Sequence, residues 1–284
     1  RKIQSLQLNP YTDNIDYAYA SAESANWYDN DDTGPHVFTP ENPNCTKPGL
    51  MAPGNACVPG MRMQLTHYLE NVNNKPNPKT LFIIWVGGND MINDIDKLIY
   101  LYEKTGIDKQ TLYKNSLAFA NDEKSIRSNN NSIHFSYPVY NIHKAVEELE
   151  QHGVSPQQIY VANLPDLSSA PAAKALTKNN KILLSILHLM TNLYNFNLYI
   201  ALTTDSKLHF QKSHLISTYD FQEKIFKHPE QYGFTNIEDS CVTNKADPIC
   251  QGYFFFNTLH PTAPSGKLIA NNFIQEIQAS HPNT

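Results

Sequence analysis

The stretch LFIIWVGGNDMIND, residues 81–94, runs six apolar residues into two glycines and an Asn-Asp pair. A short, continuous apolar run is typical of a parallel strand covered on both faces, so residues 81–86 are predicted to form a central strand of an α/β sheet. Ligands of such sheets bind beyond the carboxyl ends of the strands. The Gly-Gly-Asn-Asp segment, residues 87–90, is therefore expected on the edge where chemistry is usually done; a plain turn is the alternative, because these are common turn residues.

The composition is that of one folded domain. The chain has 284 residues, of which 17% are charged, and a formal net charge of −5. This balance does not favour a nucleic-acid-binding protein, and no apolar run is long enough to span a membrane. Because no signal peptide opens the sequence, we expect either a cytosolic protein or the mature form of a secreted one. A single domain over residues 1–284 is the simplest assignment.

The four cysteines form two sequence-local pairs. Cys45 and Cys57 flank a loop rich in Pro and Gly, and Cys241 and Cys250 flank a polar one. Such pairs are typical of disulfide-closed loops in an oxidising compartment, which favours the secreted form. A zinc site is the alternative, but neither pair has the two-residue spacing of a zinc knuckle; pairing between the two loops also stays open. The first pair would close a loop excursion at about residues 29–60.

The apolar spacing along the rest of the chain predicts alternating strands and helices. Gly153 falls where a helix C-cap belongs, and the strand–helix–strand order around it predicts a parallel βαβ crossover. The longest helix is apolar nearly all round, which is typical of a buried helix, with an acyl-chain groove as the alternative. The expected elements are a strand starting at 2–6, helices at 62–70, 95–102 and 140–152, an exposed loop at 121–132, a strand at 159–162, one helix at 173–203, an apolar run at 253–256 and a final helix after His260.

A second segment with chemical character stands near the C-terminus. In GYFFFNTLHPTAPSGKLIA, residues 252–270, an aromatic run leads to Asn257, and His260 follows three residues later, before a proline. A lone histidine is more often structural than catalytic. This one follows an apolar run and precedes an amphipathic helix, so it is expected at the end of a strand, as the 87–90 segment is.

Together these segments resemble the GDSL or SGNH hydrolases, in particular the bacterial secreted branch of lysophospholipases A and glycerophospholipid–cholesterol acyltransferases. Residues 87–90 resemble the Gly-x-Asn-Asp block, and His260 stands in a segment similar to the Asp-x-x-His-Pro-Thr block. Three further stretches resemble the family's intervening segments in the right order: IDYAYASAES from Ile15, NLPDLSSAPAA from Asn163 and HPEQYGFTNIEDSCVT from His228.

The resemblance implies a three-layer α/β/α, flavodoxin-like fold with a mostly parallel central sheet. It also implies an acyl-enzyme mechanism, in which a serine attacks an ester and a histidine relays the proton. Carried over residue by residue, Asn89 donates its side-chain amide to the oxyanion and His260 is the base. Ser21 stands where the family usually has a glycine that donates its backbone N–H to the same oxyanion. No cofactor and no metal are expected, since the eleven histidines are scattered.

The nucleophile block of the family, Gly-Asp-Ser-Leu, has no counterpart in this sequence. Ser5 stands before a leucine, but the four residues ahead of it include one apolar residue, Ile3, too little for a buried strand before a nucleophile. Ser5 is therefore not favoured as the nucleophile. A segment carrying the true serine is interpreted as missing near residues 6–7.

The position of the triad aspartate is occupied by Asn257. An asparagine can accept a hydrogen bond from the imidazole, but it carries no charge and can hold the wrong tautomer; in a protease triad the same change lowers turnover by about 10⁴. An engineered change, a natural variant and a bound anion that supplies the charge all stay open as interpretations.

The function implied by the resemblance is that of a secreted lipolytic serine esterase acting on phospholipids or lysophospholipids, with water or a sterol alcohol as the acyl acceptor. Its expected partners are the lipid substrate, a membrane surface in transient contact and a protease that activates the enzyme at the Cys45–Cys57 loop, which is otherwise interpreted as a lid. Two alternatives stay open: a carbohydrate acetylesterase, and a pseudoenzyme that binds lipid or sterol without turnover. Without its serine, the chain itself is expected to show little or no catalysis.

Overall fold

A computed structural model describes residues 60–92, 136–244 and 250–280, and six single positions outside these ranges. The single positions are Ala22, Ser24, Ile99, Asp108, Gln110 and Thr111. Four sequence predictions lie wholly or almost wholly outside the described residues: the first strand, the loop excursion at 29–60, the helix at 95–102 and the exposed loop at 121–132.

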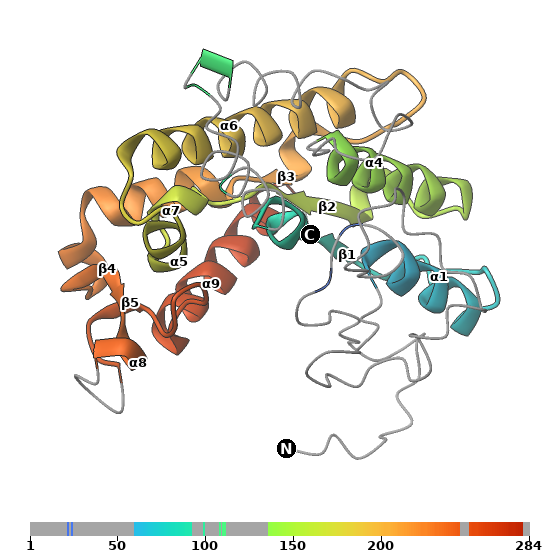
Figure 1. Cartoon of the computed structure of the whole chain (residues 1–284). Helices are drawn as coiled ribbons and strands as arrows, with labels where there is room; N and C mark the ends of the chain where they lie inside the picture. Colours follow the sequence, from blue (N-terminus) through green and yellow to red (C-terminus); the bar gives the residue numbers. More distant parts are fainter. Residues whose placement is uncertain are drawn as a thin grey trace, which may run out of the picture.

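The main sheet has three parallel strands in the order β1-β2-β3 (Figure 1). These are β1 (Phe82–Ile84), β2 (Ile159–Ala162) and β3 (Leu215–Ile216), with Phe82 opposite Ile159 and Val161 opposite Leu215. The helix α4 (Ser136–Gln151) lies between β1 and β2 in the chain, as the βαβ prediction requires. Gly153, two residues after the end of α4, adopts a positive φ of 81°, which confirms the glycine cap.

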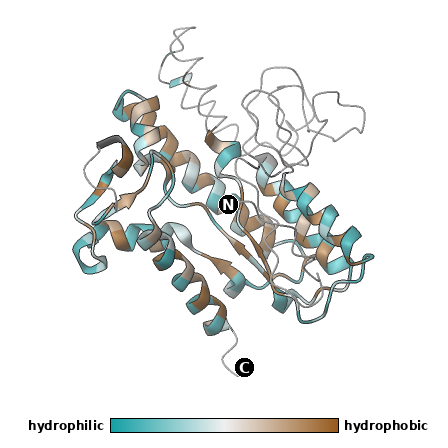
Figure 2. Cartoon of the chain, turned by 90° about the horizontal axis from the view of Figure 1, so that it is seen from below, coloured by the Kyte–Doolittle hydropathy of each residue, from teal (hydrophilic) through white to brown (hydrophobic). Residues whose placement is uncertain are grey.

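Helices cover both faces of this sheet. On one face, α1 (Met61–Asn71), α4 and α6 (Lys181–Thr203) share a single core with β1 and β2, because their apolar stripes all point inward. On the other face, α9 (Ala263–Ser280) packs Phe273 and Ile277 against Tyr160, Ala162 and Ile216. Figure 2 shows the hydrophobic residues on the strands and on the inner sides of the helices. The α/β class is thus confirmed, with short parallel strands.

The prediction that β1 is covered on both faces is wrong for the described residues. Phe82 and Ile84 pack into the shared core, but Leu81, Ile83 and Trp85 are 43%, 49% and 45% exposed. The outward face of β1 meets α9 in a contact between Trp85 and Phe273, whose rings are 5.3 Å apart. Continuous apolar sequence cannot reveal this, since the covering of a strand face depends on which helix crosses it.

The single helix predicted at 173–203 is two helices, α5 (Pro171–Leu176) and α6. Lys178 and Asn179 adopt φ angles of 52° and 58°, and the Asn180 side chain accepts a hydrogen bond from the backbone of Ile182 as the N-cap of α6. Asparagine tolerates the left-handed region and favours N-caps, so the Lys-Asn-Asn run ends one helix and starts the next. The prediction that this helix is buried holds for one face of α6 only, since Phe196 and Ile200 are 60% and 37% exposed. The buried residues are Leu183, Ile186, Leu187, Met190, Thr191, Tyr194, Leu198 and Leu202.

A second, two-stranded parallel sheet follows α7 (Thr218–Lys227) and consists of β4 (Asn236–Ser240) and β5 (Tyr253–Phe255). The prediction of one central sheet is wrong in this respect, because β5 pairs with the polar strand β4 and not with the main sheet. Between its strands, α8 (Cys241–Asn244) begins at Cys241, which forms a disulfide with Cys250. The pairing within the sequence-local pair is confirmed there, and it is consistent with an oxidising compartment.

Short 3₁₀ segments connect the larger elements: Pro156–Gln158, Leu167–Ser169, Lys212–His214 and Pro229–Tyr232. A search of the described helices found none with the length and hydropathy needed to cross a bilayer.

Candidate active site

The turn after β1 is built around Gly87. This glycine has φ +109°, and the hydroxyl of Tyr194 donates to the carbonyl oxygen of Val86 at 2.9 Å directly beside it. Residues 88–92 then begin a helix, with the Met91 N–H bonded to the Gly87 carbonyl at 3.0 Å. The glycine lets the chain turn sharply off the strand, and Asn89 consequently lies in the first helical turn at the carboxyl end of β1.

Gly87→Ala is expected to destabilise the protein by about 2–5 kcal/mol, since the left-handed backbone costs about 1–2 kcal/mol and overpacking adds about 1–3 kcal/mol. A Cβ on Gly87 would clash with the Tyr194 hydroxyl and lie 2.8 Å from its Cζ. The matched control is Gly153→Ala, where φ is +81° but nothing lies within 4 Å of the added Cβ. Urea denaturation should show the larger loss for Gly87→Ala; equal losses would contradict the assigned packing.

Asn89 and Asp90 are both bonded to a segment far away in the sequence. The side-chain amide of Asn89 donates to the carbonyl oxygen of Ala22 at 2.8 Å. Ser24 donates to the Asp90 carboxylate through its backbone N–H, at 3.0 and 3.2 Å to the two oxygens, and through its hydroxyl at 2.6 Å. Asn141 of α4 donates to the Ser24 hydroxyl at 3.0 Å. Asp90 thus ties the turn to Ser24.

Burial raises the pKa of Asp90 to about 6, against an ordinary value of 3.8, and the hydrogen bonds from Ser24 oppose this rise. Below pH 3.8 the carboxyl is protonated whether the chain is folded or unfolded. Between pH 3.8 and about 6 the unfolded chain loses this proton while the folded protein keeps it, so this group's contribution to stability falls as pH rises.

The Asp90 carboxyl is therefore expected to lower the free energy of unfolding of the original chain by up to about 3 kcal/mol between pH 4 and pH 7. Asp90→Asn should not show this fall. The measurement is urea denaturation of both proteins at several pH values: the free energy of unfolding of the original chain should fall more steeply than that of Asp90→Asn. Asp108→Asn is the control for the direction of the pH effect. Backbone and side-chain hydrogen bonds from Thr111 lower the pKa of Asp108, so this carboxyl should make the free energy of unfolding rise with pH, and Asp108→Asn should lose that rise. A wild-type profile parallel to that of Asp90→Asn would contradict the assignment.

His260 and Asn257 form a hydrogen-bonded pair on the loop after β5. The Nδ1 atom of His260 lies 3.0 Å from the amide nitrogen of Asn257 and 3.1 Å from its amide oxygen. That oxygen also accepts the backbone N–H groups of Leu259 at 2.9 Å and His260 at 2.6 Å. The spacing of three residues therefore brings the two side chains together, as predicted.

The contacts of Asn257 favour the wrong imidazole tautomer for a base. Its oxygen already accepts two backbone N–H groups, which use both lone pairs of an amide oxygen, so the NH₂ group is the natural partner of His260 Nδ1. When Nδ1 accepts a hydrogen bond, the single ring proton of the neutral imidazole is on Nε2. An Nε2 atom that carries a proton cannot take one from a nucleophile.

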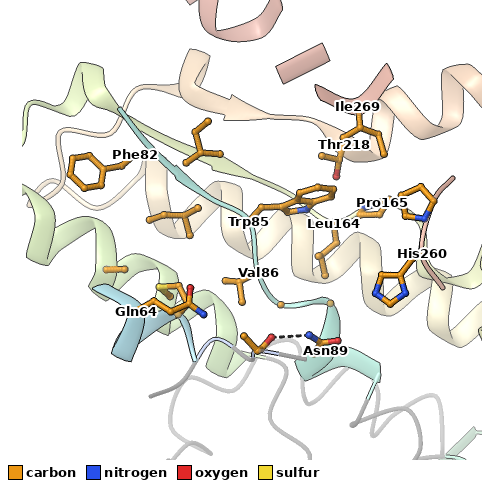
Figure 3. Close-up of a pocket in the computed structure, with 18 of the residues that line it drawn as sticks. Gln64, Phe82, Trp85, Val86, Asn89, Leu164, Pro165, Thr218, His260 and Ile269 are labelled. Carbon is orange, nitrogen blue, oxygen red and sulfur yellow. Dashed lines mark hydrogen bonds between the residues drawn. The ribbon is translucent and has the colours of Figure 1, made fainter. Parts of the chain in front are cut away.

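Asn89 and His260 line one cleft of about 1210 Å³, and they lie near each other at the carboxyl end of β1 (Figure 3). The cleft follows β1 from Lys79 at the start of the strand to the Gly87 turn. Most of its other walls are apolar, including Leu65, Phe82, Ile83, Trp85, Val86, Leu164, Leu167, Phe221, Phe254, Phe255, Leu259 and Ile269. A polar pair at one end of a long apolar cleft can hold a ligand with a polar head and a hydrocarbon chain.

Several predicted site residues lie outside the described residues: Ser5, Ser21, Cys45 and Cys57. Ala22, next to the predicted Ser21 donor, does line the cleft beside Asn89. Among the described residues, no cluster of His, Cys, Asp and Glu could hold a metal ion. The sequence interpretation gave no role to Ser24, Asn141 or Tyr194, which act through contacts between distant segments.

Comparisons with known proteins add no relative. Neither a scan against protein-family models nor a search of curated proteins found a match.

Proposed function

We propose that the protein is a secreted lipolytic ester hydrolase of the GDSL or SGNH type, acting on acyl esters of phospholipids or lysophospholipids. One observation carries the proposal: Asn89 and His260, which stand far apart in the sequence, lie at the same end of one apolar cleft. The parallel sheet, with helices on both faces, supports the three-layer form of this fold. The Cys241–Cys250 disulfide supports secretion.

In this proposal each residue has one task. The amide of Asn89 carries two N–H groups, of which one bonds Ala22, so that the second can stabilise the negative oxygen that forms when the ester carbonyl is attacked. His260 takes the proton of the attacking nucleophile and gives it to the leaving alcohol. The attacking serine is not assigned to any described residue.

The apolar lining of the cleft supports a substrate with a long acyl chain. An acyl chain lying along β1 would contact the exposed face of Ile83 and Trp85, and burying such surface contributes roughly 25 cal/mol per Å². A short acetyl group would fill little of this volume, which makes a carbohydrate acetylesterase the weaker alternative. Transfer of the acyl group to a sterol alcohol needs the same residues, with the alcohol in place of water.

The second candidate is a lipid-binding protein without turnover. The tautomer favoured by Asn257 supports it, because a histidine that carries its proton on Nε2 is a poor base.

Intact mass and labelling with a long-chain fluorophosphonate distinguish the two candidates. A protein that carries a nucleophilic serine in this site gains the mass of the phosphonyl group at that serine, and His260→Ala abolishes the reaction. A protein that binds lysophosphatidylcholine but is never labelled, even as Asn257→Asp, is the lipid-binding form. Absence of both labelling and lipid binding would refute the proposed function.

A further inference from the structure

Ala22 and Ser24 are joined to residues 89–90 by a clamp of four hydrogen bonds. One runs from Asn89 to Ala22, and three run from Ser24 to the carboxylate of Asp90. A fifth bond, from Asn141, attaches Ser24 to α4. All five are side-chain bonds between segments distant in the sequence, so they fix a tertiary contact rather than a local turn.

The hydrogen bonds of the clamp fix the orientation of the Asn89 side-chain amide. An amide group is planar, so the bond from one N–H to the carbonyl oxygen of Ala22 also fixes the direction of the other N–H. That carbonyl oxygen in turn lies two residues before Ser24, whose hydroxyl and backbone N–H are both held.

The clamp is attached to a rigid part of the fold. Ser24 is fully buried and Asn141 is 5% exposed, while the neighbours of Asn141 on α4, Ile142, Ala145 and Val146, are completely buried in the main core. A helix packed in this way moves little relative to the sheet.

Desolvation raises the pKa of the Asp90 carboxyl to about 6, so its ionised form is disfavoured in the folded protein. An apolar side chain would fill the same space without a charge to desolvate. A polar network placed directly beside a residue of the candidate site fits a role in orienting that residue.

We propose that Ser24, Asp90 and Asn141 are positioning residues, which hold Ala22 and Ser24 on the turn after β1 and thereby aim the second N–H of Asn89 at an anion in the cleft. This inference rests on the proposed function, because it takes Asn89 as the donor to the ester oxyanion.

The test measures binding, so it needs no catalysis and uses the chain as it stands. Decylphosphonate carries a tetrahedral anion on a hydrocarbon chain, whereas decanol carries the same chain without the anion. Calorimetric titration of both ligands at pH 8 keeps Asp90 ionised in the original chain and in the variants that retain it. The variants are Ser24→Ala, Asn141→Ala, Asn89→Ala and the double variant Ser24→Ala with Asn89→Ala.

Ser24→Ala and Asn141→Ala are each expected to weaken decylphosphonate binding by about fivefold, the equivalent of one hydrogen bond, and to leave decanol binding within about twofold. In the Asn89→Ala background, Ser24→Ala should have no further effect, because the clamp acts through Asn89. Ser168→Ala is the matched control: Ser168 also donates its N–H and hydroxyl to a buried aspartate, Asp166, at 3.0 and 2.7 Å. It should bind both ligands as the original chain does.

Each other outcome overturns a distinct claim. If Asn89→Ala weakens phosphonate binding while Ser24→Ala and Asn141→Ala do not, the positioning role is wrong and the proposed function stands. If both clamp variants weaken decanol binding equally, or if their effects add to that of Asn89→Ala, the clamp is a general structural element. If Asn89→Ala itself binds phosphonate normally, the proposed function fails.

Discussion

Asn257→Asp is expected to switch His260 to the tautomer with its proton on Nδ1. The change keeps the shape of the side chain. One carboxylate oxygen can accept the backbone N–H groups of Leu259 and His260, as the amide oxygen does now, and the other can accept the imidazole Nδ1–H. The unprotonated Nε2 atom is then able to act as the base. In any form of the protein that carries its serine, ester hydrolysis should rise by about 10⁴-fold, the size of the effect in a protease triad.

The tautomer is measured on the chain itself, by ¹⁵N NMR of the His260 ring at a pH where the imidazole is neutral. The rate is measured as fatty-acid release from lysophosphatidylcholine. Asp220→Asn is a control for the general effect of charge, because Asp220 lies at the first turn of α7, where its hydrogen bonds are with Ser217. A ring that already carries its proton on Nδ1 in the original chain would show that Asn257 does not limit catalysis.

Asn89→Ala is expected to lower turnover by about 10²–10³-fold, the usual cost of losing one donor to an oxyanion. The Michaelis constant should change little, since the uncharged ester carbonyl gains less from this donor than the transition state does. The comparison needs a form of the protein that carries its serine, with Asn257→Asp as the parent, so that the base is active in both proteins. Steady-state rates with a long-chain p-nitrophenyl ester give both constants.

Asn180→Ala is the control for a general loss of structure. Asn180 also bonds a backbone group through its side chain, as the N-cap of α6, and it is absent from the lining of the cleft. This variant should lose about 1 kcal/mol of stability and retain its turnover. A similar fall in turnover for both asparagine variants would mean that Asn89 acts only on folding.

Local patterns predicted the parts of the fold that depend on nearby residues. The strand at 159–162 and the glycine after α4 follow from apolar runs and from the backbone freedom of glycine, and both are as expected. The contact between Asn257 and His260 was predictable for the same reason, because a spacing of three residues in a turn brings side chains together.

The sequence could not predict features set by distant contacts. The exposed face of β1 depends on where α9 crosses the sheet, and the pairing of β5 with β4 joins an aromatic strand to a polar one without an alternating pattern. The clamp on Asn89 joins residues 24, 90 and 141. Residues 24 and 90 stand in stretches that resemble family blocks, but no local pattern shows which of their side chains bond, and Asn141 stands in neither stretch.

The most direct test of the account is an NMR titration of the ¹⁵N-labelled chain with decylphosphonate, which mimics the tetrahedral oxyanion and needs no nucleophile. The side-chain amide of Asn89 and the ring nitrogens of His260 should shift together, with one dissociation constant, because both line the same end of the cleft. Shifts confined to other residues, with Asn89 and His260 unchanged, would contradict an ester-hydrolysing site at this position.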